Sequence, residues 1–362
     1  MKKFLLPFTS CIFLLCSITH FSCVKKYAVS KDEANRFAKQ IETSLNNGNP
    51  GIFERAIYTP ELISIIKEKS EKAKEFGFIQ GFSRTFSLKG LGEKLITSIK
   101  NGSYTLIRSY EKEEKKHLLF RMFGDGGLNY HDLLLLKVKD SIKIADVYVY
   151  TQGEELSKTI ADLIDDVDKS DNGSSNSGIK ILTKFKRLRD RKDYAGIKKL
   201  YEGLQPDLKK NKGLAAIYIF ACQELNQEDY VKALEQFSMN VPDASNAYLL
   251  MLDVYYVKKD IPKGLNVINK LDSLVGKDPF LDYYRGAFYL LEDNNKEAKS
   301  AFEKVFAYDP SIALNMQNLV MSCVKMQEND RAKAVIAGYK KTPDFKQSFI
   351  DEIYQEYPDL KE

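Results

Sequence analysis

Apolar residues follow two different spacings in the two halves of the chain. From about residue 179 onward they recur every three or four positions, which is the period of amphipathic helices. Between residues 103 and 150 they form short runs rich in strand-forming residues, separated by polar turns such as Gly124-Asp125-Gly126-Gly127. The pattern predicts an all-α C-terminal part that follows an N-terminal part with a sheet.

The N-terminal part combines several helices with a sheet. Helices are predicted after Ser30, at Phe53–Ile57, from Thr59-Pro60 onward, and more weakly at Phe78–Ile99. Four strands follow, at residues 104–110, 118–123, 128–138 and 142–150, and a helix over 154–164 closes the region. We expect an α+β domain over residues 30–164, with helices on a four-strand antiparallel sheet. This order of elements resembles the nuclear-transport-factor-2-like cone fold.

A polar segment separates the two parts. Residues 165–178 contain almost no apolar side chain and are rich in Gly, Ser, Asn and Asp. That composition is typical of a flexible linker.

The segments after the linker repeat a unit of two helices. One position in the second helix is usually small, and a bulky apolar residue follows four positions later. The first position holds Ile197, Ala233, Gly264, Ala298 and Ala332, at offsets near a ~34-residue period. The second position holds Tyr201, Phe237, Ile268, Phe302 and Ile336. We expect the small residues to lie where paired helices approach.

The copy from Pro279 to Pro310, with Gly286, Ala298 and Phe302 in place, resembles the tetratricopeptide repeat. The resemblance implies a solenoid of about five repeats over residues 179–342, a capping helix and tail over 343–362, and a protein-binding inner surface. The positions that would line this surface are Tyr218, Asn246, Leu249, Asp253, Tyr256, Phe280, Tyr283 and Gln317. This set lacks the paired Lys and Asn that bind acidic C-terminal tails in one subfamily. The alternative is that the stripe forms core, or is covered by the N-terminal domain.

The first residues predict export and a lipid anchor. Lys2 and Lys3 precede a mostly apolar stretch, and Ser22-Cys23 follows at the distance of a signal-peptide cleavage site. His20 to Cys23 resembles the lipobox of bacterial lipoproteins, with His20 where Leu is usual. The resemblance implies a signal peptide over 1–22, lipidation at Cys23, a tether over 23–29, and an outer-membrane protein facing the periplasm. An ordinary secreted protein is the alternative.

Charge and cysteine content exclude some classes of protein. The formal net charge of the 362 residues is +5, and charges of both signs alternate at Glu111–Lys116, so no nucleic-acid partner is expected. Outside the N-terminal segment only Cys222 and Cys323 remain, and we expect both to be buried and free.

Catalytic chemistry has little support. His131 and Asp132, with Asp146 on the next strand, are the best acid–base candidates, yet neighbouring strand residues face opposite sides of a sheet. No spacing of residues supports a metal site, a phosphate loop or a cofactor. The sequence favours a non-catalytic envelope lipoprotein that binds protein partners through its repeats. The alternative is a small-ligand receptor with a pocket in the α+β domain.

Overall fold

The computed structural model describes residues 27–75, 90–125, 127–170, 177–240 and 247–361. Its N-terminal helices are α1 (Lys31–Asn46), α2 (Gly51–Ala56), α3 (Thr59–Lys69), the 3₁₀ turn η1 (Lys72–Lys74) and α5 (Leu91–Ser98). Helix α1 begins at a capping box, in which the Glu33 amide donates to the Ser30 hydroxyl and the Ser30 amide donates to the Glu33 carboxylate. Most of the weak helical run predicted at 78–99 lies outside the described residues.

The sheet has five antiparallel strands in sequential order. They are β1 (Ser103–Lys112), β2 (Lys115–Phe123), β3 (Asn129–Val138), β4 (Ser141–Val149) and β5 (Glu154–Glu155). The first four match the predicted strands. The fifth takes two residues from the start of the predicted closing helix and pairs them with Tyr148 and Val149 before α6 (Leu156–Ser170) begins.

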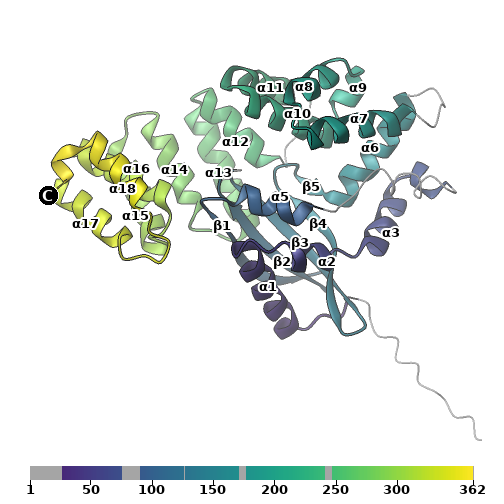
Figure 1. Cartoon of the computed structure of the whole chain (residues 1–362), viewed down its shortest axis with the longest axis horizontal. Helices are drawn as coiled ribbons and strands as arrows, with labels where there is room; N and C mark the ends of the chain where they lie inside the picture. The colour runs from purple at the N-terminus through teal and green to yellow at the C-terminus, as the bar shows by residue number, and fades with distance from the viewer. Residues whose placement is uncertain (1–26, 76–89, 126, 171–176, 241–246, 362) are drawn as a thin grey trace, which may run out of the picture.

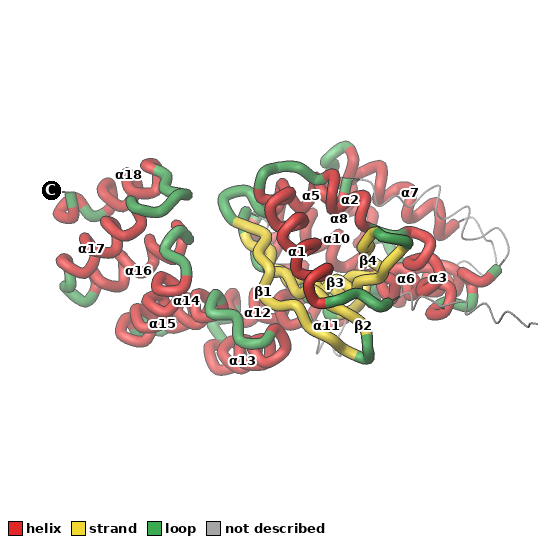
Figure 2. The backbone as a smooth tube through the Cα atoms, turned by 90° about the horizontal axis from the view of Figure 1, so that it is seen from below, coloured by secondary structure: helices red, strands yellow, loops and turns green. Residues whose placement is uncertain are grey.

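One face of the sheet packs on the N-terminal helices. Tyr104, Phe120, Leu133 and Ile144 are fully buried on this face, in one cluster with Ile41 of α1. Figure 2 shows α1, α2 and α5 lying across the strands on this side. The predicted order of helices on an antiparallel sheet is confirmed.

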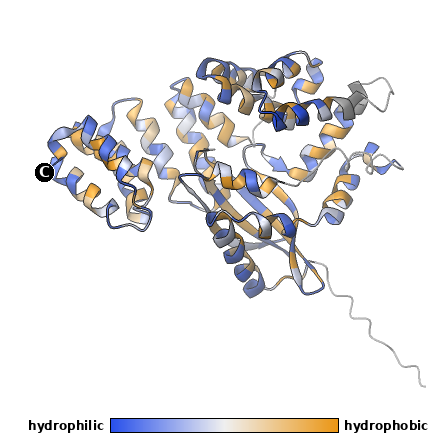
Figure 3. Cartoon of the chain, in the orientation of Figure 1, coloured by the Kyte–Doolittle hydropathy of each residue, from blue (hydrophilic) through white to orange (hydrophobic). Residues whose placement is uncertain are grey.

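The C-terminal part is a long series of packed helices in consecutive pairs. The pairs are α7 and α8 (Ser177–Asp190, Tyr194–Glu202), α10 and α11 (Lys212–Leu225, Gln227–Asn240), α12 and α13 (Tyr248–Val257, Ile261–Val275), α14 and α15 (Leu281–Leu290, Asn295–Tyr308), and α16 and α17 (Ala313–Lys325, Asn329–Tyr339). The short α9 (Pro206–Lys209) follows the first pair, and α18 (Gln347–Glu356) and η2 (Pro358–Leu360) close the chain. Most of these helices carry both polar and apolar residues, as Figure 3 shows.

Small residues lie where helices approach, within a pair at Gly286, as the register predicts, and between neighbouring pairs at Gly264. A Cβ atom built on Gly264 would lie 2.1 Å from the Phe288 ring, and one on Gly286 would lie 2.5 Å from the Phe302 ring. Ala298 and Ala332 occupy equivalent buried positions in the next two pairs. Any larger side chain at Gly264 or Gly286 would displace a neighbouring ring.

The segment predicted as a linker is helical at both ends. Helix α6 continues to Ser170 and α7 begins at Ser177, while residues 171–176 lie outside the described ranges. The acidic residues are held by partners, since Asp165 accepts a hydrogen bond from Ser70 at 2.6 Å and Asp166 one from Asn211 at 3.0 Å. These hydrogen bonds stabilise the end of α6, although the low apolar content of the segment predicted a linker.

The second face of the sheet packs against the middle of the helical series. Leu119, Tyr130 and Tyr150 of the sheet share one core cluster with Leu249 of α12 and Phe280 at the start of α14. In Figure 1 the series runs from α7 around to α18, with the sheet beside α12 and α13 on its inner side. The sheet is therefore a central layer with helices on both faces.

A buried ion pair lies in this interface. Arg121 Nη1 is 2.6 Å from Asp278 Oδ1, and the two side chains are 3% and 0% exposed. The Tyr130 hydroxyl donates to Asp278 Oδ2 at 2.8 Å, and the Phe280 amide donates to Asp278 Oδ1 at 3.1 Å. The Arg121 guanidinium also lies 4.6 Å from the centre of the Phe280 ring. Arg121 and Tyr130 belong to the sheet, and Asp278 and Phe280 to the helical series.

Two further contacts join the same parts. Arg108 Nη2 of β1 donates to the Leu274 carbonyl near the end of α13 at 2.8 Å. The chain then turns at Gly276 with φ +83°, and a Cβ there would lie 3.0 Å from the Arg108 guanidinium. Farther along, Lys346 Nζ donates to Asn101 Oδ1 at 2.7 Å.

Replacing Asp278 by Ala should destabilise the whole protein. Arg121 would keep a buried charge without a partner, which costs roughly 3–5 kcal/mol of unfolding free energy. Chemical denaturation followed by circular dichroism measures the loss. Asp272→Ala is the matched control, because the Asp272–Arg285 pair at 2.9 Å is partly exposed and should contribute less than about 1 kcal/mol. Equal losses in the two variants would contradict a dominant role for the buried pair.

Candidate functional site

A cavity of about 780 Å³ lies between the sheet and the C-terminal half of the helical series. We call it the aromatic cavity. One wall is the edge of the sheet where β1 starts and β2 ends, including Thr105, Arg121 and Phe123. The other wall comes from α12, α14, the segment 309–314 and the segment 344–349. Its volume is within the range of protein binding pockets.

Aromatic rings from two helices dominate the second wall. The rings of Phe280 and Tyr283 stack with centroids 5.6 Å apart, and those of Tyr283 and Tyr284 meet edge to face at 5.3 Å. Tyr256 meets Phe288 edge to face at 5.6 Å. Tyr256 and Leu314, both lining the cavity, are 44% and 45% exposed. These contacts hold the rings in place while leaving apolar surface open to an occupant.

Carboxylates outnumber basic groups around this cavity. Asp125, Asp253, Asp309 and Asp344 line it, with the basic residues Arg121 and Lys346. Arg121 is neutralised by Asp278, and Lys346 donates to the neutral amide of Asn101. The lining is therefore aromatic with a net negative charge.

Asp253 is the carboxylate set deepest among the rings. The Tyr230 hydroxyl donates to its Oδ2 at 2.8 Å, and among the described residues its Oδ1 has no hydrogen-bond partner and no lysine or arginine pairs with it. Burial raises the pKa of Asp253 to about 6, against a lowering contribution from the Tyr230 hydrogen bond. At neutral pH the ionised Asp253 carboxylate is therefore stabilised by one hydrogen bond and by no neighbouring cation among the described residues.

The edge strand β1 is closed to a further strand by α1. The Asn46 side chain accepts from the Tyr104 amide at 2.8 Å and donates to the Tyr104 carbonyl at 3.1 Å. Glu42 accepts from the Leu106 amide at 3.0 Å. Because these backbone groups are already paired, strand addition is blocked there and an occupant of the cavity meets side chains instead.

The structure brings together four of the eight residues that the repeat resemblance implied. Asp253, Tyr256, Phe280 and Tyr283 all line the aromatic cavity. The other described members lie elsewhere. Tyr218 of α10 stacks on Tyr201 of α8, between the first and second pairs. Leu249 is buried against the sheet, and Gln317 donates to Glu352 of α18 at 2.8 Å. Asn246 and Cys23 lie outside the described residues.

The sheet-side wall could not be found from repeat positions. Arg121 and Phe123 come from a strand, and their approach to α14 depends on contacts between residues more than 150 positions apart. One signal was present, because Arg121 is a lone basic residue in the apolar run from Leu118 to Phe123. Such a residue in a buried strand requires a partner.

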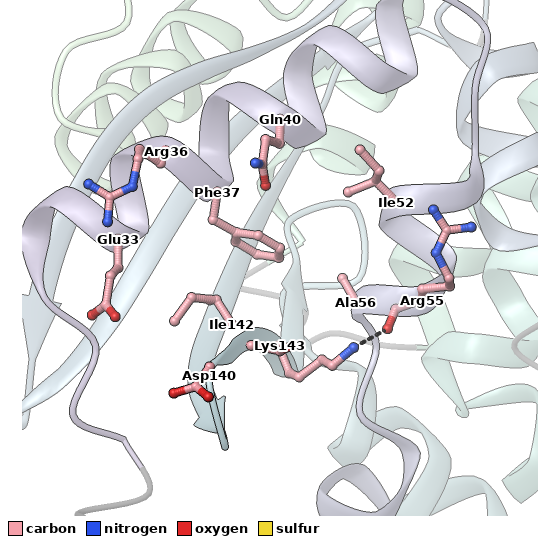
Figure 4. A pocket seen from close by; sticks show the side chains of 11 residues that line it. Glu33, Arg36, Phe37, Gln40, Ile52, Arg55, Ala56, Asp140, Ile142 and Lys143 are labelled. Carbon is pink, nitrogen blue, oxygen red and sulfur yellow. Dashed lines mark hydrogen bonds between the residues drawn. The ribbon is translucent and has the colours of Figure 1, made fainter.

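A second, more open pocket of about 410 Å³ lies on the other side of the sheet. Figure 4 shows Phe37 of α1 and Ile52 of α2 around its floor, with Arg36 and Arg55 at its sides. Lys143 Nζ donates to the Arg55 carbonyl at 2.9 Å. Hydrogen bonds from Lys137 and Ser30 lower the pKa of Glu33 to about 2, so its carboxylate is ionised and already bound. This pocket is the place where the α+β domain could hold a small ligand.

The candidate acid–base residues do not converge. His131 lies on the helix-covered face, where its ring nitrogens are 3.3 Å from the Tyr104 hydroxyl and 3.1 Å from the Asn129 amide nitrogen, and burial lowers its pKa to about 4. Asp132 lies on the opposite face, with Tyr110 and His117 as partners. Asp146 accepts from the Ser157 amide at the start of α6. The opposite orientation of His131 and Asp132 is as predicted.

Among the residues that the structure describes, no helix is both long and apolar enough to cross a membrane. In those same ranges no cluster of three or more His, Cys, Asp or Glu side chains is placed to hold a metal ion, and Cys222 and Cys323 are buried and unbridged.

The fold and the site together define a two-part protein: an α+β domain docked on the inner side of a series of helical pairs, with a shared aromatic cavity. Comparisons of the chain with protein-family models, curated proteins and solved structures gave no match.

Asp253→Asn should stabilise the protein at neutral pH. The folded-state pKa of about 6 exceeds the ordinary value of 3.8, so folding favours the protonated form. The stability linked to that proton is fully present below pH 3.8 and is lost as pH rises through about 6. Asn keeps an oxygen for Tyr230 without the charge, so we expect a gain of about 1–3 kcal/mol at pH 7.5 that vanishes near pH 4.

Thermal and chemical denaturation of both proteins at the two pH values measures this gain. A variant less stable than the parent protein at pH 7.5, or a gain independent of pH, would contradict an ionised and poorly compensated Asp253.

Proposed function

We propose that this protein is a non-catalytic scaffold that binds an extended segment of a partner protein in the aromatic cavity. The observation that carries the proposal is the cavity itself, with exposed apolar side chains at Tyr256 and Leu314 and walls from both the sheet and the helical series. Aromatic side chains that keep exposed area are enriched at protein interfaces. The helical pairs supply one wall, in keeping with the tetratricopeptide-like register of the sequence.

The geometry also favours side-chain recognition. Strand addition at Tyr104–Leu106 is blocked by Asn46 and Glu42, and much of the inner surface of the helical series is filled by the protein's own sheet. The site left for a partner is the part next to α14 and α16. A short segment fits this space, since about 780 Å³ holds several side chains.

We propose in addition that Cys23 carries a lipid that holds the scaffold at a bacterial envelope membrane, facing the periplasm. The supporting pattern is the apolar N-terminal stretch followed by Ser22-Cys23. Anchoring would place the cavity near other envelope proteins.

Ala287→Trp should block partner binding. Ala287 lines the cavity on α14, and an indole there would fill space next to Tyr256 and Tyr283. We expect a partner recovered near one-to-one with the parent protein from detergent extracts to fall about tenfold or more with this variant. Quantitative mass spectrometry of affinity-purified complexes measures the ratio.

Ala337→Trp is the matched control, because Ala337 is exposed on α17 and does not line the cavity. Recovery of the partner should be unchanged in this variant. If Ala287→Trp recovers as much partner as the parent protein, or if no stoichiometric partner is found, the scaffold proposal is overturned. Thermal stabilisation of a partner-free protein by a small anion would assign the function to the pocket of Figure 4.

Cys23→Ala tests the anchor. Without the thiol no lipid can be attached and lipoprotein-type processing should fail, so we expect a larger precursor that is absent from the lipid-labelled fraction. Metabolic labelling with an alkyne fatty acid, followed by gel shift, measures both effects. Labelling retained in the Ala variant would contradict lipidation at Cys23.

A further inference from the structure

Asp253 is a carboxylate of the aromatic cavity that lies among rings and, within the described residues, pairs with no lysine or arginine. Its Oδ2 accepts from Tyr230, while among the described residues its Oδ1 accepts no hydrogen bond. Isolated carboxylates in such surroundings are costly unless a cation or several donors reach them. Because Oδ1 is not closed off from the cavity, a donor that enters the cavity can complete this site.

The surroundings of Asp253 select the charge of that occupant. Tyr256 follows Asp253 one helical turn later on α12. Tyr283 and Tyr284 of α14 line the same cavity, and Tyr284 is close enough to Asp253 to interact with its charge. Ring faces attract cations, and more strongly where water is excluded. The remaining lining adds Asp309 and Asp344, against basic groups that already have partners in Asp278 and Asn101.

We propose that Asp253 is the specificity-determining residue of the cavity and receives a lysine or arginine side chain from the partner segment. The inference rests on the proposed function and deepens it. The free Oδ1 accepts a hydrogen bond from the ammonium or guanidinium, and the tyrosine rings pack around the aliphatic stem and the charge. An acidic or neutral segment would leave the carboxylate uncompensated.

The test uses butylguanidinium and butylammonium as probes on the purified full chain. Butylurea is the neutral control, because it has nearly the shape of butylguanidinium without the charge. Saturation-transfer NMR titrations measure the dissociation constants. We expect saturable binding of both cations, with butylurea weaker by about tenfold or more, as the loss of a charge-assisted hydrogen bond predicts.

Asp253→Asn should weaken both cations about tenfold and leave butylurea unchanged. Because this variant is expected to be at least as stable as the parent protein at neutral pH, misfolding would not explain such a loss. Asp344→Asn removes the same charge from another part of the lining and should change the affinity by less than threefold. Equal losses of affinity in the two variants would mean that the net negative charge of the lining, rather than Asp253 itself, attracts the probes.

Partner recovery and probe affinity together distinguish the role of Asp253 from the role of the whole cavity. Suppose that Ala287→Trp abolishes partner recovery while Asp253→Asn changes neither probe affinity nor partner recovery. The cavity then binds a partner, but Asp253 does not receive a cationic side chain from it. If Ala287→Trp leaves partner recovery intact, the scaffold proposal fails even where the cations bind to Asp253. Cations that bind no more tightly than butylurea would overturn the inference directly.

Discussion

The ion pair between Arg121 and Asp278 holds the sheet against the helical series. Arg121 lies in the middle of an apolar strand and Asp278 just before α14, and both side chains are almost fully buried. Each charge would be unstable in this interface alone, so each requires the other. Their contact, with Tyr130 and Phe280 around it, sets how far the sheet enters the curve of the helices. The aromatic cavity is the space left beyond that contact.

The elements themselves were largely predictable, because local patterns define them. The spacing of Gly264, Ala298 and Ala332 predicts close approach of neighbouring helices. The structure buries all three, with Gly264 against the Phe288 ring of α14. The polar residues 165–170 were misleading, since their helix depends on partners such as Ser70 that are far away in the sequence. The two-residue β5 is likewise fixed by its pairing with β4 rather than by any strand pattern of its own.

Only the helical wall of the cavity was predictable from the sequence. Asp253, Tyr256 and Tyr283 were implied by the repeat resemblance, and the structure places all three in the lining of the cavity. The docking of the sheet was one of the alternatives that the sequence left open, and it buries Leu249 while leaving Tyr256 exposed. That choice depends on contacts between Arg121 and Asp278, which are 157 positions apart. No local pattern can encode which face of a helix a distant strand will cover.

Hydrogen–deuterium exchange on the full chain, with and without its co-purified partner, tests the composite site most directly. The account predicts that binding slows exchange in α14 and, at the same time, at the start of β1 and the end of β2, because both walls contact the occupant. Slower exchange confined to α13 and α15, which do not line the cavity, with both walls unchanged, would place the partner elsewhere and contradict a shared cavity.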